Sequence, residues 1–337
     1  MPGVALVRSG GEATQISLRE LSPKFSSVSI DGFRVASTDA DARGVDLSTI
    51  AQGSIAGIEL FKALTPDKDA DAIAGSVNLV TKKAPVNRML YLDSKGAYNK
   101  LDNSYNQYNF NARYGERFFD NVLGVQVLGN IEKRVRSNES DALTYDQTSL
   151  VSQTSVDWQF SNFLLNYISE IRKRNGISLL LDFNTPDSGS IKINNVYSKT
   201  FRDYMIYGRN YPSWSSNSIL YNARNVQQDI NTFNGYISGD NNLFGLSLNW
   251  GLSFAQSKSE TPFDYQLDFQ ESSGFLDPVT HQPISGMKFL PASLHHGPPE
   301  QIISYAFNNY DKAFLYDAYK RSARSYTKEN SFYMNIS

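Results

Sequence analysis

The chain of 337 residues carries 32 lysines and arginines against 34 acidic residues, and it contains no cysteine. This near balance argues against a nucleic-acid partner, because such binding surfaces carry a clear basic excess, and the missing cysteines exclude a disulfide framework and a cysteine metal site. The mean hydropathy is -0.40, and no apolar run approaches the ~18 residues that a transmembrane helix needs. This does not exclude membrane-spanning β-strands, because their lipid-facing and lumen-facing residues alternate and their average hydropathy is ordinary. The 20 tyrosines and 20 phenylalanines are consistent with such strands.

Residues 1–84 hold short apolar runs separated by Gly, Pro, Asp and Ser, which predicts a small mixed α/β unit. Asp31 and Gly32 end one expected strand in a turn, where the glycine tolerates a positive φ and the aspartate bonds to nearby backbone. Apolar spacing over residues 46–53 predicts a short capped helix. Alternation over residues 55–62 and in GSVNLVTKK predicts strands.

Beyond Pro85 the sequence changes to long stretches with a period of two, which is the spacing of β-strands. The apolar face of the clearest stretch consists of Phe244, Leu246, Leu248, Trp250, Leu252 and Phe254, with small or polar residues between them. The eleven residues of this stretch, at ~3.3 Å each and tilted by ~45°, rise about 25 Å, which matches the apolar band of an outer membrane. We therefore expect this face to point toward lipid.

The same alternation predicts several further strands after Pro85. They cover residues 90–98, 105–115, 122–131, 163–172, 177–183, 191–198 and 230–238, and another begins at Ser331. The segments 199–228 and 259–329 exceed ordinary hairpin loops. Short turns at one end and long loops at the other are typical of outer-membrane barrels.

Three stretches before Pro85 resemble the second half of the plug domain of TonB-dependent outer-membrane receptors. They read ISLRELSPKFSSVSIDG, ARGVDLSTI and IAGIELFKALTPDKDADAIAGSVNLVTKKA. The residues that match the family pattern are Arg19, Pro23, Val28, Ile30, Asp31, Gly32, Ile58, Glu59, Lys62, Gly75, Val77, Asn78, Thr81 and Lys82. Two positions depart from it, since Glu20 replaces a glycine and Ala74 replaces the first glycine of a pair.

The resemblance implies a mainly β fold: a transmembrane antiparallel barrel of roughly 22 strands around a small α/β plug. Residues 1–84 then form a partial plug that lacks its N-terminal part. Residues 85–337 form the first eight or nine strands of the barrel, truncated at the C-terminus. We accordingly expect a fragment of a longer protein, without a signal peptide or an energy-coupling segment.

The implied function is energised uptake of a scarce ligand, such as a siderophore or a glycan, across the bacterial cell outer membrane. The implied partners are outer-membrane lipid, the TonB complex of the inner membrane and an extracellular siderophore or oligosaccharide, with no nucleic acid. In this family, plug arginines face carboxylates of the barrel wall, and Arg19 and Arg43 are the matching candidates. Neither a nucleophile elbow nor a framed carboxylate pair is present, so the sequence predicts no enzyme and no cofactor.

Two other interpretations fit the alternation alone. A passive porin-like barrel would lack the plug motifs and would conduct ions through an open pore. A secreted β-sandwich that binds carbohydrate would have strands of ~5–6 residues and no face for lipid. Dependence on detergent separates the membrane proteins from the sandwich.

Two groups of residues have a spacing that suggests metal binding but lack the rest of the pattern. Asp67, Asp69 and Asp71 are spaced as in a calcium loop, but the required glycine and closing glutamate are missing, so we expect a plug loop. The histidines, His281, His295 and His296, are too few and too poorly placed for a metal site.

Four aromatic residues gather in the segment DYMIYGRNYPSW, which we expect to be a loop. They are Tyr204, Tyr207, Tyr211 and Trp214. Such amphipathic rings stack on sugars or siderophores, and they equally pack within a loop. The sequence leaves both roles open.

Overall fold

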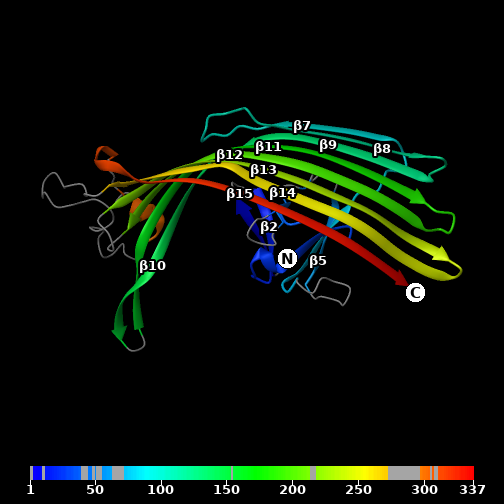
Figure 1. Ribbon diagram of the computed structural model, residues 1–337, viewed down its shortest axis with the longest axis horizontal. Helices are drawn as coiled ribbons and strands as arrows, with labels where there is room; N and C mark the ends of the chain where they lie inside the picture. Colours follow the sequence, from blue (N-terminus) through cyan, green and yellow to red (C-terminus); the bar gives the residue numbers. More distant parts are fainter. Residues whose placement is uncertain are drawn as a thin grey trace.

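The computed structural model describes residues 3–9, 12–38, 45–47, 50, 55–62, 72–152, 155–212, 218–271, 297–303, 306 and 310–337. Strands dominate these residues, and a broad curved sheet arches over a small domain at its concave side (Figure 1). No helix in this described part is long and apolar enough to cross a membrane.

The small domain consists of two sheets built from the first six strands. Its elements are β1 (Val4–Ser9), β2 (Glu12–Leu18), η1 (Pro23–Phe25), β3 (Ser26–Ile30), β4 (Phe33–Arg34), β5 (Ile55–Phe61) and β6 (Gly75–Thr81). Strands β1 and β2 form a hairpin, and the second sheet has the order β4-β3-β6-β5, with β3 parallel to β6. The strands predicted before Pro85 are confirmed, while most of the predicted helix over 46–53 lies outside the described residues.

Alternate residues of these strands bury a compact apolar core. It contains Ile16, Leu18, Ile30, Phe33, Val35, Val45, Ile50, Ala74, Val77 and Leu79, together with Tyr236 of the large sheet. The polar residues of the same strands therefore remain free to contact the large sheet.

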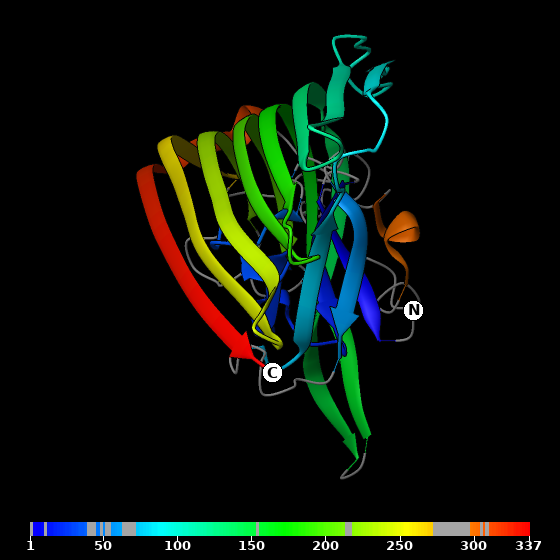
Figure 2. The ribbon, with the colours of Figure 1, turned by 90° about the vertical axis from the view of Figure 1, so that its right-hand side faces the viewer.

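The large sheet is antiparallel and has nine strands. They are β7 (Met89–Gly96), β8 (Tyr108–Phe118), β9 (Leu123–Val135), β10 (Asn138–Ser152), β11 (Ser155–Asn184), β12 (Ser190–Pro212), β13 (Ile219–Leu243), β14 (Leu246–Glu271) and β15 (Ala313–Ile336). Their order is β15-β14-β13-β12-β11-β9-β8-β7, and β10 pairs with β11 beside β9. Within the described residues, β7 and β15 are the end strands of this order, so the sheet curves without closing, and the small domain lies within the curve (Figure 2).

Strand β11 is long enough to pair with two strands along the same edge. Its residues 171–183 pair with β9, and its residues 155–168 pair with β10. The two strands predicted at 163–172 and 177–183 are therefore one strand of 30 residues. Strand β10 was not predicted.

The prediction of long loops over 199–228 and 259–329 is wrong in large part. Strands β12 and β13 occupy most of the first segment, β14 continues to Glu271, and β15 begins at Ala313 instead of Ser331. Charged residues such as Arg202, Asp203 and Arg224 interrupt the alternation in these extensions, although Tyr211 and Tyr221 belong to a second apolar cluster there. Alternation detects a strand only where one face is apolar.

Strands β13 and β14 meet in a two-residue turn. Phe244 and Gly245 have φ of 55° and 83°, the two left-handed positions of a type I′ hairpin. Phe244 is therefore a fully exposed turn residue, and the strand predicted at 244–254 begins at Leu246. Leu248 lies near that end of the strand.

The two faces of β14 differ as the alternation predicts. Gly251, Ser253 and Ala255 are buried toward the small domain, whereas Leu252 and Phe254 are exposed on the other face. A Cβ atom at Gly251 would lie 2.4 Å from the ring of Phe33 in the small domain. The concave face of the sheet thus holds small and polar side chains against the small domain.

Candidate functional site at the contact between the small domain and the sheet

The residues of the predicted plug motif form one hydrogen-bond network. The Oδ1 atom of Asn78 accepts hydrogen bonds from the backbone N–H of Gly32 at 2.8 Å and from the Ser29 hydroxyl at 3.1 Å. Its Nδ2 donates to Glu59 Oε2 at 2.8 Å. One asparagine on β6 therefore connects β3, its turn and β5.

Asp31 links this network to the wall of the large sheet. The backbone N–H of Thr81 donates to Asp31 Oδ1 at 2.9 Å, while the hydroxyls of Thr81 and Tyr236 both donate to Oδ2. Tyr236 belongs to β13, and its ring stacks on Phe33 with centroids 4.6 Å apart. The predictions missed Tyr236, although an aromatic residue on the polar face of its strand was an available signal.

Gly75 allows β5 and β6 to approach closely. Its φ is 133°, and a Cβ atom there would lie 2.5 Å from the carbonyl oxygen of Phe61. The neighbouring Lys62 is exposed, and the carbonyl of Lys82 accepts a hydrogen bond from Gln126 of the sheet at 3.3 Å. The glycine is thus a structural requirement, while the two lysines lie at the margin of the contact.

The turn after β2 adopts a conformation that glycine would favour. Arg19 and Glu20 have φ of 53° and 61°, so Glu20 has the backbone conformation for which the family pattern places a glycine. Arg19 is exposed in this turn, and no ion pair joins it to a sheet carboxylate within the described residues. Arg43 lies outside the described residues, and Ala74 is buried in the core.

Replacing Glu20 with glycine is expected to stabilise the small domain by about 0.5–1 kcal/mol. A left-handed conformation costs a non-glycine residue roughly 1–2 kcal/mol, which glycine avoids. The larger conformational entropy of glycine in the unfolded state offsets part of this stabilisation. Ser22→Gly is the matched control, because Ser22 has a φ of −55° and gains nothing. Hydrogen exchange of β6 amides in urea measures both changes; equal effects of the two substitutions would contradict the prediction.

A cluster of buried charges joins the β1–β2 hairpin to the wall. Glu12, at the start of β2, forms ion pairs with Arg172 at 2.9 Å and with Arg136 and Arg174 at 3.3 Å each. Arg174 also pairs with Glu132 at 3.0 Å. The expected polarity is reversed in this cluster, where a carboxylate of the small domain faces arginines of the wall.

A second layer of pairs holds these arginines in place. Arg172 is 2% exposed and donates to Glu170 at 2.9 Å, and Arg202 of β12 donates to the same carboxylate at 2.8 Å. Burial alone would raise the pKa of Glu12, but the charges of Arg174, Arg136 and Arg172 outweigh burial and hold that pKa below its ordinary value. Glu12 is therefore an ionised partner of the wall at neutral pH.

A polar cavity of about 470 Å³ opens beside this cluster. Among the residues that the structure describes, six basic side chains line it, namely Lys82, Lys95, Arg113, Arg134, Arg136 and Arg174. The acidic ones are Glu12, Asp93 and Glu132, and Asn109, Asn111 and Asn130 supply amides. The cavity thus offers an excess of positive charge at the contact between the small domain and the sheet.

The four aromatic residues expected in a ligand loop do not form one site. Tyr204, Tyr207 and Tyr211 lie on β12, and Trp214 lies outside the described residues. The guanidinium carbon of Arg202 lies over the ring of Tyr204, 5.0 Å from the ring centroid, on the face that carries the charge cluster. Tyr211 is fully buried with Phe163, so packing is its role.

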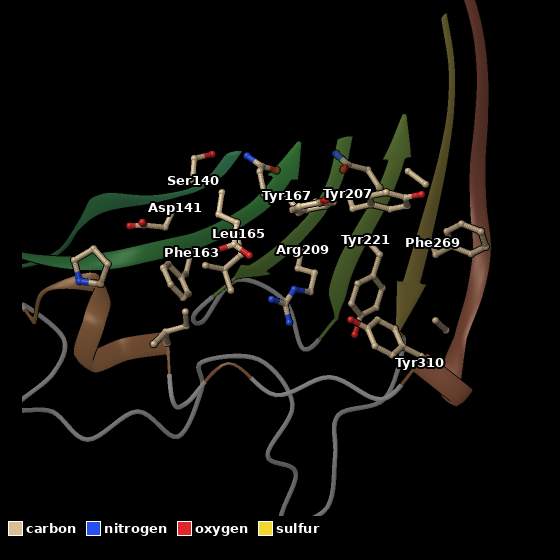
Figure 3. A pocket seen from close by; sticks show the side chains of 18 of the residues that line it. Ser140, Asp141, Phe163, Leu165, Tyr167, Tyr207, Arg209, Tyr221, Phe269 and Tyr310 are labelled. Carbon is tan, nitrogen blue, oxygen red and sulfur yellow. The ribbon is translucent and has the colours of Figure 1, made fainter. Parts of the chain in front are cut away.

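Tyr207 instead lines a larger cavity of about 870 Å³ on the opposite face of the sheet. Aromatic side chains of β11, β12, β13 and β14 converge there with Tyr310, and α1 (Pro299–Ile302) lies along one side (Figure 3). The rings of Tyr221 and Tyr310 are 5.2 Å apart. Within the described residues, no group of three or more acidic or histidine side chains is arranged to hold a metal ion, and all three histidines lie outside those residues.

Three comparisons with known proteins bear on this arrangement. A family model described as the TonB-dependent receptor plug domain matches residues 1–76. No curated protein matches the sequence.

Several solved structures are similar at low sequence identity. A mutant of the ferric enterobactin receptor from Pseudomonas aeruginosa, in complex with enterobactin, is 14% identical, with a TM-score of 0.41 over 81% of this chain and 52% of that chain. The unliganded ferric citrate transporter FecA is 12% identical, with a TM-score of 0.36 over 83% of this chain and 60% of that chain. The siderophore receptor PirA from Acinetobacter baumannii is 14% identical, with a TM-score of 0.33 over 80% and 52%.

The chain therefore spans 52–60% of the length of these solved chains. The match over residues 1–76 confirms the resemblance found in the sequence: this part of the chain is a plug domain of the TonB-dependent receptor family.

Proposed function

We propose that this protein is a receptor that takes up an iron–siderophore complex across the bacterial outer membrane, with energy supplied by the inner-membrane TonB complex. The plug match and the position of the plug within the curved sheet support this proposal. Exposed side chains such as Leu252 and Phe254 would contact lipid. An oligosaccharide is the second ligand class that the proposal admits.

The contact between plug and wall is the observation on which the proposal chiefly rests. A plug that rearranges during uptake must exchange its contacts for water or ligand without leaving large apolar surfaces exposed. Glu12 with its three arginines, and Asp31 with Tyr236, are contacts of this exchangeable kind. Ion pairs in such places contribute little net stability but set the fit between the two surfaces.

Uptake of a radiolabelled ferric siderophore by the native host tests the proposal. Deleting the gene should abolish accumulation under iron restriction, and restoring the gene should recover it. A protonophore should block the restored uptake, because energised transport needs the proton gradient. Uptake that survives the protonophore would instead support a passive porin, which should also conduct ions in a planar bilayer.

The sandwich interpretation does not fit the observed strands. Strands β11 to β15 have 23 to 30 residues each, whereas sandwich strands have ~5–6. Their length instead suits strands that cross an apolar band and continue beyond it. Residue 84 is kept as the proposed end of the plug domain.

A further inference from the structure

The polar cavity beside Glu12 has the composition of an anion site. Its lining carries six basic and three acidic side chains, and Glu12 is the acidic one that belongs to the β1–β2 hairpin. When Glu12 moves away, the wall keeps five cations and two carboxylates, and Lys82 of the small domain adds a sixth cation. Arginine recognises carboxylates with paired, charge-assisted hydrogen bonds.

The wall arginines retain unused donors. The Nε atoms of Arg136 and Arg174 are buried and have no hydrogen-bond partner within the described residues. Arg174 is only 7% exposed, yet it lines the cavity. A buried donor without a partner costs free energy. A carboxylate that entered the cavity could therefore accept hydrogen bonds from these donors.

Glu12 stands at the tip of its hairpin, away from the residues that anchor the hairpin. Ile16 and Leu18, farther along β2, lie in the plug core. Glu12 pairs across the hairpin with Ser9 and reaches the wall through ionic contacts. Loss of those contacts would release the tip while the core stays in place.

We propose that the cavity binds a polycarboxylate-like anion and that Glu12 is its built-in competitor. The carboxylates of the incoming anion replace Glu12 on Arg136 and Arg174, and this exchange frees the tip of the β1–β2 hairpin. The inference rests on the proposed function, to which it adds an anionic ligand class and a way for that ligand to loosen the plug.

Titration calorimetry of the full chain in detergent at low salt tests this exchange. The probe is tricarballylate, and its uncharged triamide is the control ligand. Glu12→Gln should bind tricarballylate about tenfold more tightly, since the competitor is gone, and Arg174→Gln should bind at least tenfold more weakly. Arg224→Gln should change the affinity less than twofold, because Arg224 pairs with Asp264 outside the cavity.

Hydrogen exchange reports the second half of the proposal without any substitution. Tricarballylate should accelerate exchange of the first amides of β2 in the unmodified chain, while the amides of β6 stay protected. Equal binding of the triamide, unchanged or weaker binding by Glu12→Gln, or binding without faster β2 exchange would overturn the inference. Neither measurement requires the TonB complex, so the two proposals can fail separately. If the cell takes up no siderophore but tricarballylate still displaces Glu12, only the proposed function is rejected. If uptake is energised but tricarballylate does not displace Glu12, only this inference is rejected.

Discussion

Replacing Arg172 with methionine is expected to lower the free energy of unfolding by about 3–5 kcal/mol, because a buried ion pair that loses one partner leaves an uncompensated charge. Arg172 is 2% exposed and contacts Glu12 of the plug and Glu170 of its own strand. Glu170 retains Arg202, which places the loss toward the lower end of that range. Reversible urea unfolding of the folded chain measures the change.

The control is an ion pair of similar length in an exposed position. Lys95 contacts Asp93 at 2.9 Å, and its side chain is 63% exposed. Lys95→Met should leave the free energy of unfolding nearly unchanged, because exposed ion pairs contribute little to stability. Similar losses for Lys95→Met and Arg172→Met would show that burial does not determine the strength of the cluster.

An arginine at Leu252 is expected to cost about 2–4 kcal/mol of folding stability in lipid vesicles, the penalty for a cation near the middle of a bilayer. Leu252 is 53% exposed, on the face of β14 that points away from the plug. The residues on either side in the chain, Gly251 and Ser253, are buried toward the plug. This assignment places Leu252 within the apolar band of the proposed membrane sheet.

Leu267 on the same strand and the same face provides the control. It is 43% exposed, and a bulge in β14 between Thr261 and Asp264 brings its odd-numbered position to the outer face. The 15 residues that separate it from Leu252 correspond to roughly 35 Å of height. Leu267→Arg should therefore cost at most ~1 kcal/mol, and equal losses at the two positions would argue against a membrane around β14.

Sequence alternation predicted the sheet best where one face is apolar. Residues 246–254 were predicted with the correct faces because leucines and aromatics alternate there with small residues. Residues 199–212 were predicted as a loop because Arg202, Asp203 and Arg209 break that alternation. In that region, pairing with the long neighbouring strands determines the structure. The periodicity of one strand does not show which strands will pair with it.

The plug motif was predicted more fully than its contact with the wall. Asp31, Gly32, Glu59, Asn78 and Thr81 were selected from the family pattern, and the structure brings them into contact. Glu12 and its arginines were missed, because an ion pair between residues 12 and 172 depends on how two distant segments dock. Local spacing contains no information about that docking.

The bond between Asp31 and Tyr236 also bears on how the protein folds. The two residues are 205 positions apart in the chain, whereas β3 and β6 of the plug are separated by fewer than 50 residues, as Ser29 and Asn78 show. Contacts between distant segments form late, because the entropy of closing long loops must be overcome first. We expect the plug core to assemble early and to wait, undocked, until β13 has been laid down. During that interval Glu12 and Asp31 on its polar docking surface are exposed to water. This surface would keep the undocked plug soluble and would prevent its aggregation with other chains.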